Sequence, residues 1–126
     1  MDDAEAVAHE FWRRMNTNDW SFAAQLFGVP FSLDWPQSRE RIVSAADFVA
    51  LNAAYPAAGR WTFEVIRLVG DARTAVTETI VSDTKIAATA VTFFDVEGGR
   101  IRSIREFWPD PFPAAEWRRQ WVQHLG

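Results

Sequence analysis

The chain has 126 residues, a net charge of −4 and no cysteine. This length fits one domain, and 48% hydrophobic with 24% charged residues favours a packed core over disorder. The lack of cysteine excludes disulfides, thiol catalysis and thiolate metal sites, and the negative charge argues against nucleic acid as a partner.

Two helices are predicted near the N-terminus. Apolar side chains at helical spacing indicate a first helix over residues 3–15. Asp19 suits the N-cap of a short second helix over residues 20–27, which Gly28 and Pro30 should end.

The next segment is expected to form a short strand and a third helix. Apolar and polar side chains alternate over residues 31–35, which predicts a short strand. Residues 37–41 are expected to form a polar loop. Ser44 then caps a helix over residues 45–55, which Pro56 ends.

The second half of the chain reads mainly as strands. Residues 61–69, 74–82, 86–94 and 100–107 are rich in Val, Ile, Thr and Phe, and turn residues separate them. They predict an antiparallel meander. After a proline-rich corner, residues 114–125 are expected to form a final helix.

This order of elements predicts an α+β fold, in which helices cover one face of a bent sheet. The sequence contains no internal repeat, low-complexity stretch or linker. We therefore expect a single domain over residues 1–126.

Three segments carry a resemblance to a known family. They are DWPQSRER (residues 34–41), FFDVEGGRIRSIREFWPDPF (residues 93–112) and EWRRQWV (residues 116–122). With the order of elements, they make nearly the whole chain resemble the SnoaL-like branch of the nuclear transport factor 2-like superfamily.

The resemblance implies a cone-shaped fold, also called cystatin-like. A curved antiparallel or mixed sheet wraps around a cavity, and the helices pack over its concave face. Relatives include ketosteroid isomerase, limonene epoxide hydrolase, polyketide cyclases and non-catalytic binding modules, so the fold leaves function open. It also implies a homodimer built through the sheet. The first strand should lie beside the last, which brings Asp34 and Trp35 near Glu106 and Trp108.

Acidic residues inside strands are the sharpest chemical signal. A carboxyl group in an apolar cavity has a raised pKa and can move protons near neutral pH. Asp34 and Glu106 are therefore the candidate catalytic residues. The alternative is structural: Glu78 or Glu106 could pair with an arginine on a neighbouring strand, such as Arg67, Arg73 or Arg105. The same alternative applies to Glu64 and to Asp34.

A set of large side chains is expected to line the cavity. Position by position an aromatic residue is more often core, but as a group these residues suit an apolar ligand. The predicted lining consists of Trp12, Trp35, Tyr55, Trp61, Glu78, Phe94 and Trp108.

Several kinds of site have no support in the sequence. There is no nucleophile elbow, P-loop or dinucleotide fingerprint, so no cofactor is expected. His9 and His124 lie too far apart to suggest a metal site. Ketosteroid isomerase uses a tyrosine on its first helix, whereas the one tyrosine here is Tyr55, which argues against steroid isomerisation.

Three functions stay open. The first is a cytoplasmic, dimeric protein that binds a small apolar or amphipathic molecule, as a cofactor-independent isomerase, cyclase, dehydratase or hydrolase. The second is a non-catalytic carrier or sensor, and the third is a protein-interaction module. No apolar run approaches the roughly 20 residues of a membrane span, so no membrane is expected. Trp117 and Trp121 should seal the last helix against the domain or against a partner subunit.

Overall fold

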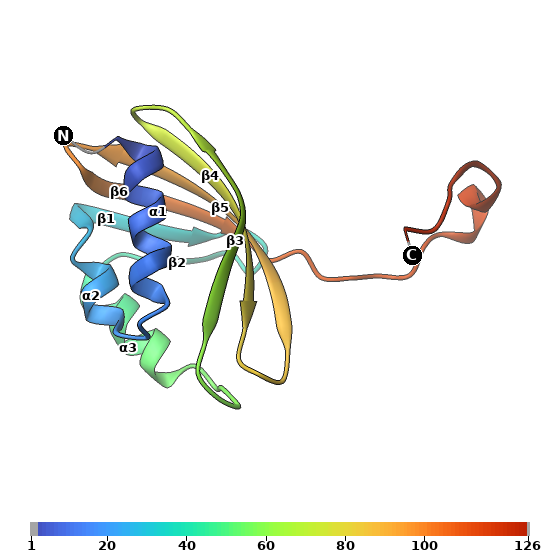
Figure 1. Cartoon of the computed structure of the whole chain (residues 1–126), viewed down its shortest axis with the longest axis horizontal. Coiled ribbons are helices and arrows are strands. Elements are labelled where there is room, and N and C mark those ends of the chain that lie inside the picture. The colour runs from blue at the N-terminus through green and yellow to red at the C-terminus, as the bar shows by residue number, and fades with distance from the viewer. Residues whose placement is uncertain (1–2, 126) are drawn as a thin grey trace.

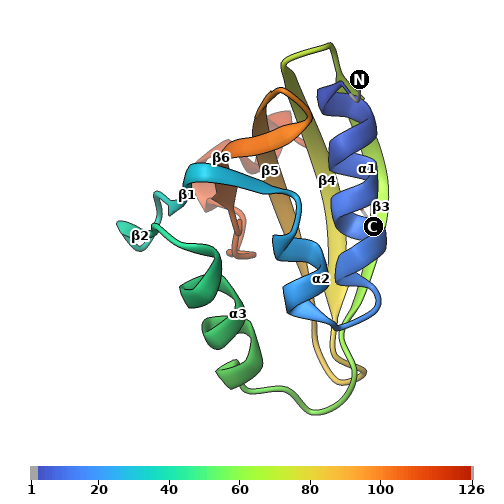
Figure 2. The same cartoon turned by 90° about the vertical axis from the view of Figure 1, so that its left-hand side faces the viewer.

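A computed structural model describes residues 3–125 and shows one curled, mixed sheet of six strands with helices over its concave face (Figures 1 and 2). The elements are α1 (Ala4–Met15), α2 (Trp20–Ala24), β1 (Phe27–Trp35), β2 (Glu40–Ile42), α3 (Ala45–Ala54), β3 (Thr62–Gly70), β4 (Thr74–Ser82), β5 (Ala87–Glu97), β6 (Arg100–Phe107) and the 3₁₀ helix η1 (Glu116–Trp121). This confirms the predicted α+β class.

The sheet runs in the order β2-β1-β6-β5-β4-β3. Strands β3 to β6 form the predicted antiparallel meander. The first strand, β1, lies parallel to β6, with Asp34 opposite Arg105. The expected neighbourhood of the first and last strands is therefore confirmed.

The N-caps of the helices form as their residue types predict. Asp3 accepts a hydrogen bond from the backbone N–H of Ala6 at 3.0 Å, and Asp19 accepts one from Phe22 at 3.1 Å. Ser44 caps α3 in the same way. Each cap satisfies a backbone donor that the first helical turn leaves without a partner, so the helices begin where short polar side chains stand.

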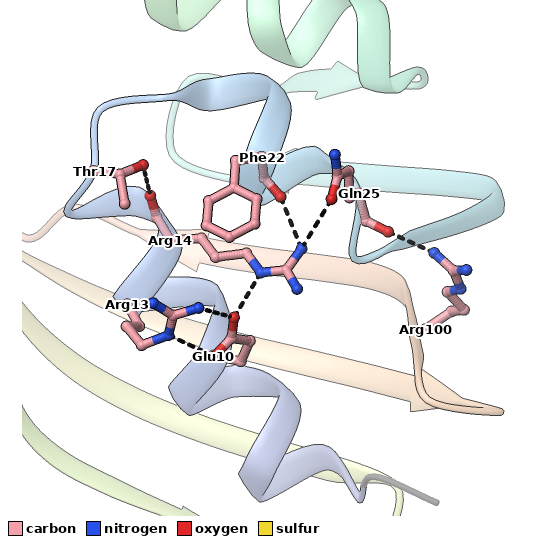
Figure 3. A network of polar contacts seen from close by, with 7 residues as sticks. All are labelled: Glu10, Arg13, Arg14, Thr17, Phe22, Gln25 and Arg100. Atoms are coloured by element: carbon pink, nitrogen blue, oxygen red, sulfur yellow. Dashed lines mark hydrogen bonds and ion pairs between the residues drawn. The ribbon is translucent and has the colours of Figure 1, made fainter.

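A charged network ties α1 to α2 (Figure 3). Glu10 accepts hydrogen bonds from the guanidinium groups of Arg13 and Arg14, and these lower the pKa of Glu10 to about 2. Arg14 also donates to the carbonyl oxygen of Phe22 at 3.0 Å and lies over the Phe22 ring. This contact holds the short helix α2 against the end of α1.

Several boundaries differ from the prediction: α2 ends at Ala24 and not at residue 27, and β5 runs to Glu97 and not to residue 94. Two further differences arise because strand pairing overrides local signals. Strand β1 begins at Phe27, because Phe27 pairs with Ile101 before an irregularity carries the chain past Gly28 and Pro30 to Ser32. The loop predicted for residues 37–41 also contributes to β2, which pairs with β1 at the sheet edge.

The predicted final helix over residues 114–125 is wrong over half of its length, and its tryptophans do not seal it against the domain. Only η1 forms, and its Trp117 and Trp121 side chains are 75% and 70% exposed. A short helix is marginal in water when its apolar face packs on nothing. Residues 109–125, the C-terminal arm, extend away from the body of the domain (Figure 1).

None of the helices within residues 3–125 has the length and hydropathy that a bilayer crossing requires.

Candidate functional site

A pocket of about 680 Å³ opens on the concave side of the sheet. Its walls come from α1, α3, all six strands, and the segments that precede β3 and follow β6. Eight aromatic residues line it: Phe11, Trp12, Trp35, Phe48, Tyr55, Trp61, Phe63 and Trp108. The wall is therefore mostly apolar and rich in rings.

Glu106 places a carboxyl group in this apolar wall. Strand β6 alternates, so Ile104 and Glu106 face the helices while Arg105 faces the other side of the sheet. Glu106 is only 7% exposed. Its Oε1 accepts a hydrogen bond from Trp35 Nε1 at 3.1 Å, and its Oε2 lies 2.6 Å from the hydroxyl of Thr92.

The environment of Glu106 favours the protonated form. Burial raises the pKa of Glu106 above its ordinary value, because little water remains to solvate the charge. Hydrogen bonds from Thr92, Trp35 and Trp108 offset part of this shift by stabilising the carboxylate. The group is thus held in a fixed position and can act as a proton donor at a higher pH than an exposed glutamate.

Threonines extend the polar floor beneath Glu106, and the sequence analysis missed them. Thr92 stands opposite Glu106 on one side and opposite Thr77 on the other. The Thr77 hydroxyl accepts a hydrogen bond from Trp12 Nε1 at 3.0 Å, which orients that indole in the pocket wall. Thr77, Thr79 and Thr92 are fully buried. In the sequence, Thr77 and Thr79 alternate with Glu78, which places the threonines and the glutamate on opposite faces of β4. This alternation alone does not show which of the two faces the helices cover.

Two asparagines position the aromatic wall on β3 and were also missed. The Asn16 side chain accepts from Phe63 N at 2.8 Å and donates to Phe63 O at 2.7 Å. Asn18 makes the same paired contact with the backbone of Trp61, with both distances at 2.9 Å. The loop after α1 therefore fixes two rings of the pocket through backbone contacts.

The structure brings together many of the residues proposed from the sequence. Five of the predicted aromatic residues line the pocket with Glu106: Trp12, Trp35, Tyr55, Trp61 and Trp108. The indole of Trp35 contacts the Glu106 carboxyl directly. These residues come from six separate segments, which the curl of the sheet and the covering helices bring together.

Asp34 lies elsewhere. It neighbours Trp35 on β1 and therefore points to the opposite side of the strand. Its carboxylate pairs with the Arg41 guanidinium at 2.6 and 2.9 Å, and this contact lowers the pKa of Asp34. It lines a second hollow with Arg41 and Arg105, and Trp35 and Glu40 border both hollows. Asp34 is not among the described residues that line the pocket of Glu106.

Glu78 and Phe94 also lie outside the pocket lining. Glu78 is exposed on the outer face of β4, where its Cα partner is Arg67 on β3. Phe94 is 1% exposed beneath α1, with its ring centroid 5.5 Å from that of Phe11 and 6.3 Å from that of Trp12. Phe94 supports the wall of the pocket from behind.

Within residues 3–125, no group of three or more His, Cys, Asp or Glu side chains is placed to hold a metal ion.

The sequence profile of the SnoaL-like domain family matches residues 8–104. No curated protein matches the sequence significantly. Among solved structures, a protein from Kribbella flavida DSM 17836 with a provisional ketosteroid isomerase name is 26% identical. Its TM-score is 0.87, and the match covers 97% of this chain and 89% of that one.

Two further solved structures are similar to this chain over most of its length. An NTF-2 like protein of unknown function from Burkholderia xenovorans LB400 is 30% identical, with a TM-score of 0.75 and coverage of 95% of this chain and 93% of that one. A protein from Sphaerobacter thermophilus is 24% identical, with a TM-score of 0.72 and coverage of 86% and 98%.

Proposed function

The chain belongs to the SnoaL-like domain family, and from this premise we propose that its pocket takes up a small, largely apolar molecule, with Glu106 as the acid–base group that meets it. The family match confirms the resemblance seen in the sequence, but the fold alone does not select a reaction. One observation carries the proposal: a buried carboxyl group, held by Trp35 and Thr92, lines an aromatic pocket.

The chemistry that suits this arrangement is general acid–base catalysis without a cofactor. A protonated Glu106 can donate its proton to a carbonyl, hydroxyl or epoxide oxygen of a bound molecule, and can take a proton back in a later step. Trp35 and Thr92 hold the carboxyl in one orientation while this happens. These steps are those of an isomerase, cyclase, dehydratase or hydrolase.

Steroid isomerisation has less support than these wider classes, despite the name of the Kribbella flavida protein. Tyr55 follows α3 and lies at the pocket rather than on the first helix. The β5 residue opposite Glu106 is Thr92, which cannot supply a second carboxylic acid. We therefore propose the pocket and its acid–base group, and leave the reaction at the level of its class.

Binding in the pocket can be tested by filling it. Ala88 lines the pocket, and Ala88→Trp should place an indole inside it. We expect the neutral dye N-phenyl-1-naphthylamine to bind wild-type protein with enhanced fluorescence, and Ala88→Trp to weaken this binding by about tenfold or more. That loss corresponds to roughly 1.4 kcal/mol.

Ala87→Trp is the matched control, because Ala87 is the preceding residue on β5 and is not part of the lining. Its affinity for the dye should equal that of the wild type. Equal loss in both variants, or no binding to the wild type, would contradict a ligand pocket. A natural ligand that binds but is recovered unchanged would favour the carrier or sensor over the enzyme.

We further propose that a second copy of the chain covers the outer face of the sheet. The helices cover only the concave face (Figure 2), so β3 to β6 present their outer side chains to solvent. Phe93 is 42% exposed there, between its partners Val76 and Arg105. The face also carries Arg67 and Glu78, so two copies related by a two-fold axis can pair opposite charges.

Phe93→Asp tests this interface. A charge at the centre of an apolar interface is costly to desolvate, so we expect the variant to sediment as a monomer at a concentration at which the wild type is a dimer. Val43→Asp is the control, since Val43 is exposed beyond β2 at the opposite end of the sheet. A monomeric wild type, or an unchanged dimer in Phe93→Asp, would refute the proposed interface. A cytoplasmic location stays a prediction from the cysteine-free sequence.

A further inference from the structure

The described lining of the pocket has an unusual balance of charge. Its eight aromatic residues are joined by three carboxyl side chains, those of Glu40, Glu106 and Asp110. No Lys, Arg or His is among the described residues that line it. The remaining members are neutral, either aliphatic or with amide or hydroxyl groups.

The carboxyl groups occupy two depths. Glu106 is buried in the wall, whereas Glu40 and Asp110 are exposed. Asp110 adds a negative charge at the mouth of the pocket, which attracts cations before they enter, whereas Glu40 also lines the second hollow with Arg39, Arg41 and Arg105. Further inside, the faces of aromatic rings carry the negative part of their quadrupole and attract a desolvated cation.

The nearby arginines do not cancel this field from within the pocket. Arg39, Arg41 and Arg105 line the second hollow, on the outer side of the sheet. Arg41 is also paired with Asp34 at 2.6 Å. An anionic ligand in the pocket would therefore meet carboxyl groups and ring faces, with no positive side chain among the described lining.

We propose that the polar group of the ligand is a cationic nitrogen, so that the pocket selects lipophilic amines and ammonium ions over neutral or anionic molecules of the same shape. This inference rests on the proposed function, since it names the ligand class of the same pocket. The rings of Tyr55 and Trp61, edge to face with centroids 5.8 Å apart, line the pocket with Trp35 and Trp108 and supply the π surface for the cation.

Proton balance follows from the position of Glu106. A neutral amine that enters beside the protonated carboxyl takes its proton on the nitrogen lone pair, which leaves an ammonium–carboxylate pair. A quaternary ammonium ion has no lone pair, so a Glu106 that is protonated before binding releases its proton to solvent as the ammonium–carboxylate pair forms. Cation binding is therefore expected to strengthen as pH rises, whereas binding of a neutral isostere should not depend on pH.

The test uses three probes of one shape: benzyltrimethylammonium, its neutral carbon isostere neopentylbenzene, and the anion benzylsulfonate. Affinities for the whole chain are measured by tryptophan fluorescence, and proton release by calorimetry in buffers of different ionisation enthalpy. We expect the cation to bind about tenfold or more tightly than the neutral probe, with the anion weakest. Proton release should accompany the cation alone.

Glu106→Gln separates the carboxyl from the rings. This variant should lose most of the preference for benzyltrimethylammonium over neopentylbenzene, and release no proton. If the neutral probe binds as tightly as the cation, the amine inference is overturned while the pocket proposal stands. If none of the three probes binds and the neutral dye also fails, the proposed function itself has failed. An unchanged cation preference in Glu106→Gln would overturn the role of Glu106 in it.

Discussion

Glu106→Gln is expected to be more stable than the wild type at pH 8, and to lose this advantage as the pH falls towards 4.5. Burial raises the pKa of Glu106 above its ordinary value of 4.5, so the folded state must hold a desolvated charge when the group ionises. Burying an ionised carboxyl costs on the order of a few kcal/mol, of which the hydrogen bonds from Thr92 and Trp35 recover part. Gln keeps the shape of the side chain and never ionises.

The sign follows from proton binding. Between pH 4.5 and its raised folded pKa, Glu106 binds more protons in the folded than in the unfolded state. The free energy of unfolding of the wild type therefore falls as pH rises through this range, relative to that of Glu106→Gln. Urea denaturation of both proteins from pH 4.5 to pH 8 measures the divergence.

Glu5→Gln is the control, because Glu5 is an exposed glutamate on α1, outside the pocket and outside the sheet face proposed as the interface. Its curve should run parallel to that of the wild type at every pH. A Glu106→Gln curve that also runs parallel would show that the pocket carboxyl is solvated like one at the surface, and would remove the basis for its proposed acid–base role.

Phe94→Ala is expected to lower the free energy of unfolding by about 3–5 kcal/mol, the range for truncating a fully buried aromatic side chain. Phe94 is 1% exposed and packs edge to face against Phe11 and Trp12 of α1. Removing the ring leaves a cavity between β5 and the helix that covers it. Chemical denaturation of the wild type and the variant gives the difference directly.

Phe94→Leu separates packing from ligand binding. Leucine fills much of the volume, so its stability should lie between those of the other two proteins, nearer to that of the wild type. Because Phe94 is not part of the pocket lining, the affinity of Phe94→Leu for N-phenyl-1-naphthylamine should match that of the wild type. A tenfold loss of dye affinity with little loss of stability would instead place this ring in the pocket.

Local chemistry made much of the fold predictable. The starts of α2 and α3 were found because Asp19 and Ser44 satisfy backbone donors a few residues away, a contact that depends on neighbouring sequence alone. The segments β4 and β6 were predicted with their observed ends, because their β-branched residues and flanking turns also act locally. The grouping of Ile104 with Glu106 on one face followed from strand alternation.

Alternation does not say which face is covered, and long-range contacts supplied that answer. Trp35 and Asp34 are adjacent on β1, yet only Trp35 faces the pocket. The same holds for Thr77 and Glu78 on β4, where α1 buries the threonine and leaves the glutamate in solvent.

The pocket depends on distant segments even more strongly. Glu106 meets Trp35 because β1 lies parallel to β6, a pairing that joins residues 71 positions apart. In the C-terminal arm, the missing long-range contacts prevent the predicted structure. Its apolar spacing favours a helix, but a helix of that length needs a surface to pack on. The arm instead extends away from its own domain, and only η1 forms. Caps, strands and turns could be predicted from neighbouring residues. The burial of Glu106, and with it the raised pKa of this group, arises only because segments far apart in the chain exclude water from its carboxyl group.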